Sequence, residues 1–204
     1  KAKKIFIALQ ERYPDATCAL QYTSPFELLI ATILSAQATD VSVNKATPAL
    51  FKAFPTPKAF ASASPEEIEP YIASIGLFRS KAKSLYETSK RIEEEFAGEV
   101  PTTMKDLISL RGVARKTANV VLGNAMGKNE GVVVDTHVSR LAQRFGLTTE
   151  LKPAKIEQNL MDLFPQEDWT LLSHLLIYHG RAVCKKRGWT CENDSICAQY
   201  CSNT

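Results

Sequence analysis

The stretch that most limits how this chain can fold runs from Leu110 to Val121. A helical pattern over 104–110 meets a turn containing Gly112, and a second helix with apolar periodicity follows. Glycine takes backbone conformations that other residues resist. The unpaired amides at a helix start carry positive partial charge, so this corner suits an anion such as a phosphate. The pattern predicts a helix-hairpin-helix that grips a nucleic-acid backbone without reading its bases.

Two residues near this corner could carry chemistry. Lys116 falls in the first turn of the second helix, beside Arg115, where the helix dipole makes a neutral, nucleophilic amine easier to reach. Asp135 could accept a proton or steady a sugar cation. On spacing alone the ordinary interpretations are favoured. They make Lys116 a phosphate contact or a solvated charge, and Asp135 the N-cap of a helix.

Four stretches together resemble the endonuclease III family of DNA repair glycosylases. They are Arg115-Lys116-Thr117-Ala118-Asn119-Val120-Val121, Val134-Asp135-Thr136-His137, and the segments 35–46 and 75–82. The resemblance runs nearly end to end. It implies that Lys116 is the lysine that forms a Schiff base and that Asp135 is the catalytic aspartate.

The hairpin departs from the family pattern Leu-Pro-Gly-Val-Gly at two positions. Arg111 replaces the proline and Ala114 replaces the second glycine. Alanine does not take a positive φ cheaply, so the turn must be strained or reshaped if that position requires one. Arg111 could compensate by adding a phosphate contact. We expect Arg111, Gly112, Ala114 and Arg115 to form the DNA-binding hairpin.

The charge distribution agrees with an anionic partner. The net charge is only +3, but residues 101–148 hold seven Lys or Arg against three acids, and residues 181–187 hold four basic residues and no acid. A surface with its positive charge gathered on one side is typical of a protein that binds nucleic acid. No apolar run reaches 18 residues, and the basic start leads into an amphipathic helix. We therefore expect an intracellular monomer that binds duplex DNA and no membrane.

Helical periodicity dominates the rest of the chain. Ser24-Pro25 and Ser64-Pro65-Glu66-Glu67 are helix starts, Asp40 is expected to cap a helix that Pro48 bends, and residues 55–57 are expected to form a loop. Further helices are expected at 2–13, 26–35, 78–96, 135–145, 153–164 and 167–180. The β-branched run Val132–Val134 is too short to predict a strand. The fold class is therefore all-α.

The resemblance also implies a discontinuous architecture that composition would not reveal. It predicts a six-helix lobe at 19–129 and a second lobe formed by 1–18 and 130–204, with a DNA-binding cleft between them. It further implies that Gln37 and Leu77 fill the stack when the target nucleotide is extruded. Without the resemblance, Leu77 would be interpreted as a core residue at a helix start and Gln37 as an amide that caps a loop.

Four cysteines, Cys184, Cys191, Cys197 and Cys201, crowd into 18 residues. In an intracellular chain such a group indicates a metal or iron–sulfur site rather than disulfides. The resembled family binds a four-iron cluster with spacing C-x6-C-x2-C-x5-C, whereas here the spacing is C-x6-C-x5-C-x3-C. Asp194 and Tyr200 stand where the family's third and fourth cysteines fall. We expect a 4Fe-4S cluster, with structural zinc as the alternative and an empty, partly oxidised site third. No histidine is expected to pair with these thiols.

The sequence as a whole predicts a base excision repair DNA glycosylase with abasic-site lyase activity, acting on damaged bases in duplex DNA. Oxidised pyrimidines are the substrates that the resemblance implies. The alternatives are a relative acting on mispaired adenine, mismatched thymine or ultraviolet photoproducts, and a helix-hairpin-helix DNA-binding module without chemistry.

Overall fold

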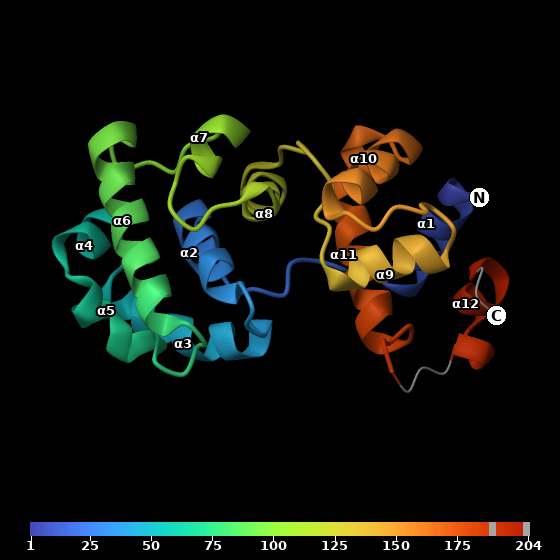
Figure 1. Ribbon diagram of the computed structural model, residues 1–204, viewed down its shortest axis with the longest axis horizontal. Helices are drawn as coiled ribbons and strands as arrows, with labels where there is room; N and C mark the ends of the chain where they lie inside the picture. The colour runs from blue at the N-terminus through green and yellow to red at the C-terminus, as the bar shows by residue number, and fades with distance from the viewer. Residues whose placement is uncertain (188–190, 202–204) are drawn as a thin grey trace. The chain divides into compact units, whose positions relative to one another are not determined.

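The structure is a computed structural model that describes residues 1–187 and 191–201, except for the side chain of Glu192 (Figure 1). Every regular element in these ranges is helical, which confirms the all-α prediction. The chain divides into two compact units, Ala19–Lys128 and a second unit that joins Lys1–Cys18 to Asn129–Thr204. Residues 188–190 of the cysteine loop lie outside the described ranges, and so does Thr204, the last residue of the predicted second lobe. No described helix has an apolar stretch long enough to cross a membrane.

The 19–128 unit is built around one apolar helix. Its helices are α2 (Pro25–Ser35), α3 (Asp40–Ala53), α4 (Pro57–Ser62), α5 (Pro65–Ile72), α6 (Phe78–Phe96), α7 (Met104–Ile108) and α8 (Arg115–Met126). Helix α2 is buried on nearly every side and packs against α3, α6 and α8, while α4 and α5 cover α6 (Figure 1). A helix that is apolar all round belongs in a core.

Local signals set most of the helix starts. Ser64 and Glu67 form the expected capping box of α5. Two expectations are wrong in detail. Thr39, not Asp40, caps α3, because the Thr39 hydroxyl accepts the Ser42 amide at 3.1 Å. Helix α3 runs through Pro48 without a break, since its buried face holds it across the lost hydrogen bond. Pro57 begins α4 rather than lying in a loop.

The other unit combines the first helix with the C-terminal third of the chain. Its elements are α1 (Ala2–Arg12), α9 (Thr136–Arg144), α10 (Pro153–Leu163), η1 (Gln166–Asp168), α11 (Trp169–Ala182), η2 (Cys191–Asn193) and α12 (Ser195–Tyr200). Helix α11 packs against α1 and α9. Val132–Val134 is buried without forming a strand, because the Val133 amide donates to the Ser173 hydroxyl of α11 at 2.9 Å. Helix α12 has no counterpart among the expected helices.

Candidate functional site

The hairpin between α7 and α8 turns at Gly112. This residue has φ +77, a left-handed conformation that favours glycine. A Cβ there would lie 3.3 Å from the Ser84 Cβ and 3.4 Å from Ile33 Cγ2. The turn is closed by the Val113 amide, which donates to the Leu110 carbonyl at 3.3 Å. Both the conformation and the close packing therefore require glycine.

Ala114 does not strain the hairpin. It is the N-cap of α8 with φ −92 and ψ 171, an extended backbone that any residue adopts. The position of the family's second glycine therefore needs no positive φ in this chain. Alanine has no side-chain oxygen to accept the first amides of α8. The Ala114 side chain therefore does not compete with an anion at the start of α8.

Lys116 is exposed in the first turn of α8, next to exposed Arg115. Within the described parts of the chain, no hydrogen bond or ion pair engages the Lys116 ammonium group. Its Nζ is therefore free to contact a ligand of the hairpin.

Asp135 is the N-cap of α9. Its Oδ1 accepts the amides of His137 and Val138, both at 2.8 Å. The ordinary interpretation of this aspartate as a cap is thus confirmed. The cap occupies one oxygen; across residues 1–187 and 191–201, Oδ2 has no hydrogen-bond partner. A capping role leaves this second oxygen available for chemistry.

Gln37 and Leu77 have an unusual backbone. They are two of the three described non-glycine residues with positive φ, at 55° and 60°. Leu77 is 63% exposed, so the interpretation as a core residue is wrong. The Gln37 side chain is exposed and caps no loop in the described ranges. Strained, exposed side chains of this kind concentrate at binding sites.

Arg111 is held by the protein itself. Its Nη1 donates to Glu87 Oε2 of α6 at 2.8 Å, and its carbonyl accepts the Thr88 hydroxyl at 2.7 Å. The side chain that replaces the family's proline is therefore anchored to α6.

Three of the four expected metal ligands lie together. The sulfurs of Cys184, Cys191 and Cys197 are buried and lie within 4.8 Å of one another. Cys201 is half-buried at the end of α12, where its amide donates to the Cys197 carbonyl at 2.9 Å. None of these cysteines forms a disulfide.

The chemistry of this trio fits a cation. Burial raises the pKa of the Cys191 and Cys197 thiols, so they are protonated unless a positive charge stabilises the thiolates. Arg144 Nη1 already donates to Cys184 Sγ at 3.0 Å. The cysteine site can therefore hold a metal ion or cluster.

Asp194 lies beside the cysteine site and holds the residues around it through hydrogen bonds. Its side chain is 7% exposed, and Oδ1 accepts the amides of Ile196 and Cys197, each at 3.0 Å. Oδ2 accepts from Arg12 of α1 at 3.1 Å. Burial pushes its pKa upward, but the Cys197 amide and the charges of His179 and Arg12 hold that pKa below the ordinary value. Asp before Ser195 is an N-cap signal that could have predicted α12.

The sequence predicts no histidine ligand beside these thiols, and the structure places His179 next to one of them as a hydrogen-bonded residue. This residue is fully buried on α11, with Nε2 3.3 Å from Cys197 Sγ and Nδ1 2.9 Å from the Tyr13 hydroxyl. Cys197 of α12 contacts this histidine of α11, a contact that sequence spacing does not reveal. His137, in contrast, has Nδ1 3.1 Å from Arg140 Nη2.

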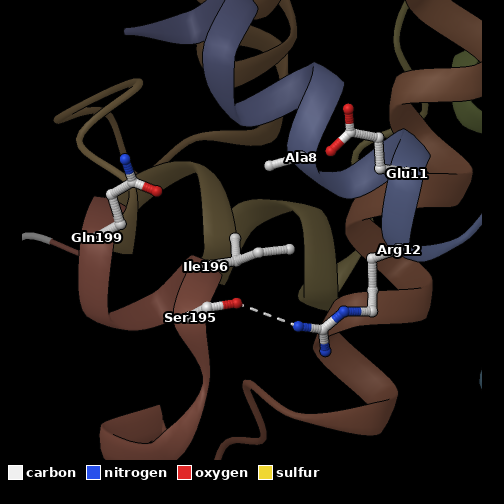
Figure 2. A pocket seen from close by; sticks show the side chains of 6 residues that line it. All are labelled: Ala8, Glu11, Arg12, Ser195, Ile196 and Gln199. Carbon is white, nitrogen blue, oxygen red and sulfur yellow. Dashed lines mark hydrogen bonds between the residues drawn. The ribbon is translucent and has the colours of Figure 1, made fainter.

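A pocket of about 370 Å³ lies between α1 and α12 and is lined by Ala8, Glu11, Arg12, Ser195, Ile196 and Gln199. In Figure 2, Arg12 extends along its edge and donates to Ser195 Oγ at 3.2 Å. None of the expected catalytic or DNA-binding residues lines this pocket.

Comparison with known proteins agrees with these features. Residues 30–166 match the model of the HhH-GPD superfamily base excision DNA repair proteins. The chain is 54% identical to endonuclease III of Synechocystis sp. over 191 residues, covering 94% of this chain and 87% of the relative. It is 42% identical to endonuclease III of Bacillus subtilis over 182 residues, covering 89% and 83%.

The fold is also similar to a solved structure, a trapped covalent intermediate of endonuclease III with DNA. The TM-score is 0.93 at 37% identity, with 99% of this chain and 96% of that chain covered. The chain therefore belongs to the HhH-GPD superfamily of base excision repair proteins, and within it to the endonuclease III family of DNA glycosylases with abasic-site lyase activity.

Proposed function

We propose that the protein removes oxidised pyrimidines from duplex DNA, with Lys116 as the nucleophile and Asp135 as its assistant. The neutral amine of Lys116 attacks the sugar C1′ of an extruded nucleotide, and the base leaves with the electron pair of the glycosidic bond. Opening of the sugar ring yields an imine. Loss of a C2′ proton then breaks the C3′–O bond, and the 3′ phosphate departs.

The observation that carries this proposal is the position of Lys116. Its ammonium group has no partner in the described ranges, and it stands on the first turn of α8, whose amides suit a phosphate. Trapped covalent chemistry is, moreover, what the similar endonuclease III–DNA structure contains.

Borohydride trapping on a duplex with an abasic site tests the nucleophile. The wild type should form a covalent adduct, and Lys116→Ala should form none. Lys105→Ala removes an exposed lysine from α7 of the same hairpin and should still be trapped. Binding without an adduct in the wild type would instead indicate a DNA-binding module without chemistry.

Asp135→Asn separates chemistry from capping. Asparagine caps helices about as well as aspartate, so the stability of the protein should change little. The loss of charge should lower base removal by at least about 100-fold. Equal rates of base removal by the wild type and Asp135→Asn would mean that Asp135 acts only as a helix cap. A set of duplexes that each carry one damaged or mismatched base would identify the substrate class.

For the cofactor we propose a 4Fe-4S cluster with a structural role, held by Cys184, Cys191, Cys197 and Cys201. It would brace the loop that carries Lys185, Lys186 and Arg187. Family membership supports the cluster. Structural zinc is the alternative, because zinc–sulfur bonds of about 2.3 Å place sulfurs about 4 Å apart around one ion, which fits the three sulfurs that lie within 4.8 Å of one another. Iron and zinc content of the purified protein decides between them.

A further inference from the structure

One face of helix α6 contacts the turn of the hairpin at three residues. Arg91 Nη1 donates to the Ser109 carbonyl at 2.6 Å, and Thr88 Oγ1 donates to the Arg111 carbonyl at 2.7 Å. One turn earlier, Ser84 packs beneath Gly112. Residues 84, 88 and 91 recur at helical spacing, so a single stripe of α6 contacts the turn at Ser109, Arg111 and Gly112.

The Thr88 hydrogen bond sets the direction of an amide. Carbonyl and N–H point in opposite directions across a trans peptide. Because the Arg111 carbonyl points at Thr88, the Gly112 N–H must point away from α6. In residues 1–187 and 191–201 this amide donates to no acceptor. Gly112 itself is exposed, so the amide is open to a ligand.

Glu87, next to Thr88, holds the side chain of Arg111. The two charged groups are 2.8 Å apart, and Lys83 approaches the other carboxylate oxygen at 3.8 Å. The same turn is thus attached twice, through the carbonyl of Arg111 and through its guanidinium group. The family's proline would limit the backbone through its ring. Here the ion pair between Arg111 and Glu87 of α6 limits the backbone instead.

We propose that Thr88 and Glu87 are positioning residues for DNA binding, which act through Arg111 to aim the Gly112 amide at a backbone phosphate. Arg111 serves as an anchor to α6 and does not itself bind phosphate. This inference rests on the DNA-binding role of the hairpin within the proposed function.

Binding to a duplex with an uncleavable abasic-site analogue tests the hydroxyl. Thr88 is fully buried, so Thr88→Val preserves its shape but leaves the Arg111 carbonyl unpaired. Kd should rise about tenfold, as expected for a lost buried hydrogen bond. Thr88→Ser keeps the hydroxyl and should bind nearly as the wild type does. The rate of abasic-site cleavage at saturating DNA should stay the same in both variants.

Glu87→Gln tests the ion pair, because an anchoring Arg111 and a phosphate-binding Arg111 predict changes in Kd of opposite sign. Glu87→Gln should weaken binding roughly threefold, in the range of a partly exposed ion pair. Glu94→Gln removes the same charge from an α6 pair with Lys90 and should not weaken binding. If Arg111 binds phosphate directly, Glu87→Gln would free it and tighten binding instead.

Salt dependence gives an independent readout. An arginine that neutralises a phosphate contributes about one unit to the slope of log Kd against log salt. Under our proposal Arg111→Ala weakens binding without changing this slope. A slope reduced by about one, or wild-type affinity in Thr88→Val, would overturn the inference. If the wild type itself fails to bind the duplex, the proposed function fails first.

Discussion

At the scale of single residues, the backbone at Leu77 supports the expectation that it enters DNA. A left-handed leucine is strained, and nothing in its burial repays the strain, because its side chain is mostly exposed. Such a cost persists where the side chain acts on a ligand. Gln37 shows the same combination.

Leu77→Ala should therefore impair function more than folding. We expect base removal from duplex DNA to fall about tenfold or more, since the gap left by the extruded base is no longer filled. Thermal unfolding should shift little. Leu151→Ala removes a similarly exposed leucine and serves as the control. Equal losses in the two variants would contradict the wedge role.

His174 should make stability depend on pH. Burial lowers its pKa from 6.5 to about 4. Between these values the unfolded chain binds the proton and the folded chain does not, so stability falls as pH falls. From pH 7 to pH 5 this group should cost about 2 kcal/mol.

Urea unfolding of the wild type and of His174→Gln at both pH values measures this effect. The variant should lose about 2 kcal/mol less on acidification. Equal losses in the two proteins would assign the pH dependence to other groups. Asp194, whose pKa is lowered, also loses stabilisation at low pH, but it does so in both proteins.

At the scale of elements, the hairpin depends on one glycine conformation. Gly112→Ala should destabilise the protein by about 1–2 kcal/mol, because alanine resists a left-handed backbone. The added methyl group also presses on Ser84 and Ile33, which should displace the Gly112 amide. DNA affinity should therefore fall as well.

Gly127→Ala is the matched control for this change. Gly127 is also left-handed, at φ +64, but a Cβ there meets nothing within 4 Å. The variant should lose similar stability and keep its DNA affinity. Comparable losses of affinity in both alanine variants would mean that general destabilisation, and not the hairpin geometry, weakens binding.

At the scale of the whole molecule, the cysteine site ties the two ends of the chain together. Arg12 near the N-terminus pairs with Asp194, and Tyr13 contacts His179. Loss of the metal or cluster proposed for this site should therefore affect the entire unit formed by 1–18 and 129–204, because metal binding is coupled to folding.

Cys201→Ser should lower the metal bound per chain and reduce the thermal unfolding temperature. Cys18→Ser, outside the site, should change neither quantity. Asp194→Cys combined with Cys201→Ser restores a thiol at the family's third position and should recover part of the metal. Unchanged metal content in Cys201→Ser would exclude Cys201 as a ligand and make His179 the next candidate.

The sequence by itself determined most of the helices, the hairpin and the cysteine group. Capping residues such as Ser64, the prolines at first helical positions and the apolar run of α2 act over a few residues, so they are readable in order along the chain. Only the tertiary structure decided which side chains support the site. Thr88 reaches Arg111 across 23 positions and Arg12 reaches Asp194 across 182. Such contacts between distant segments leave no periodicity in the sequence, so no local pattern reveals them. The left-handed backbone at Gln37 and Leu77 was likewise not readable, because residues other than glycine rarely adopt it.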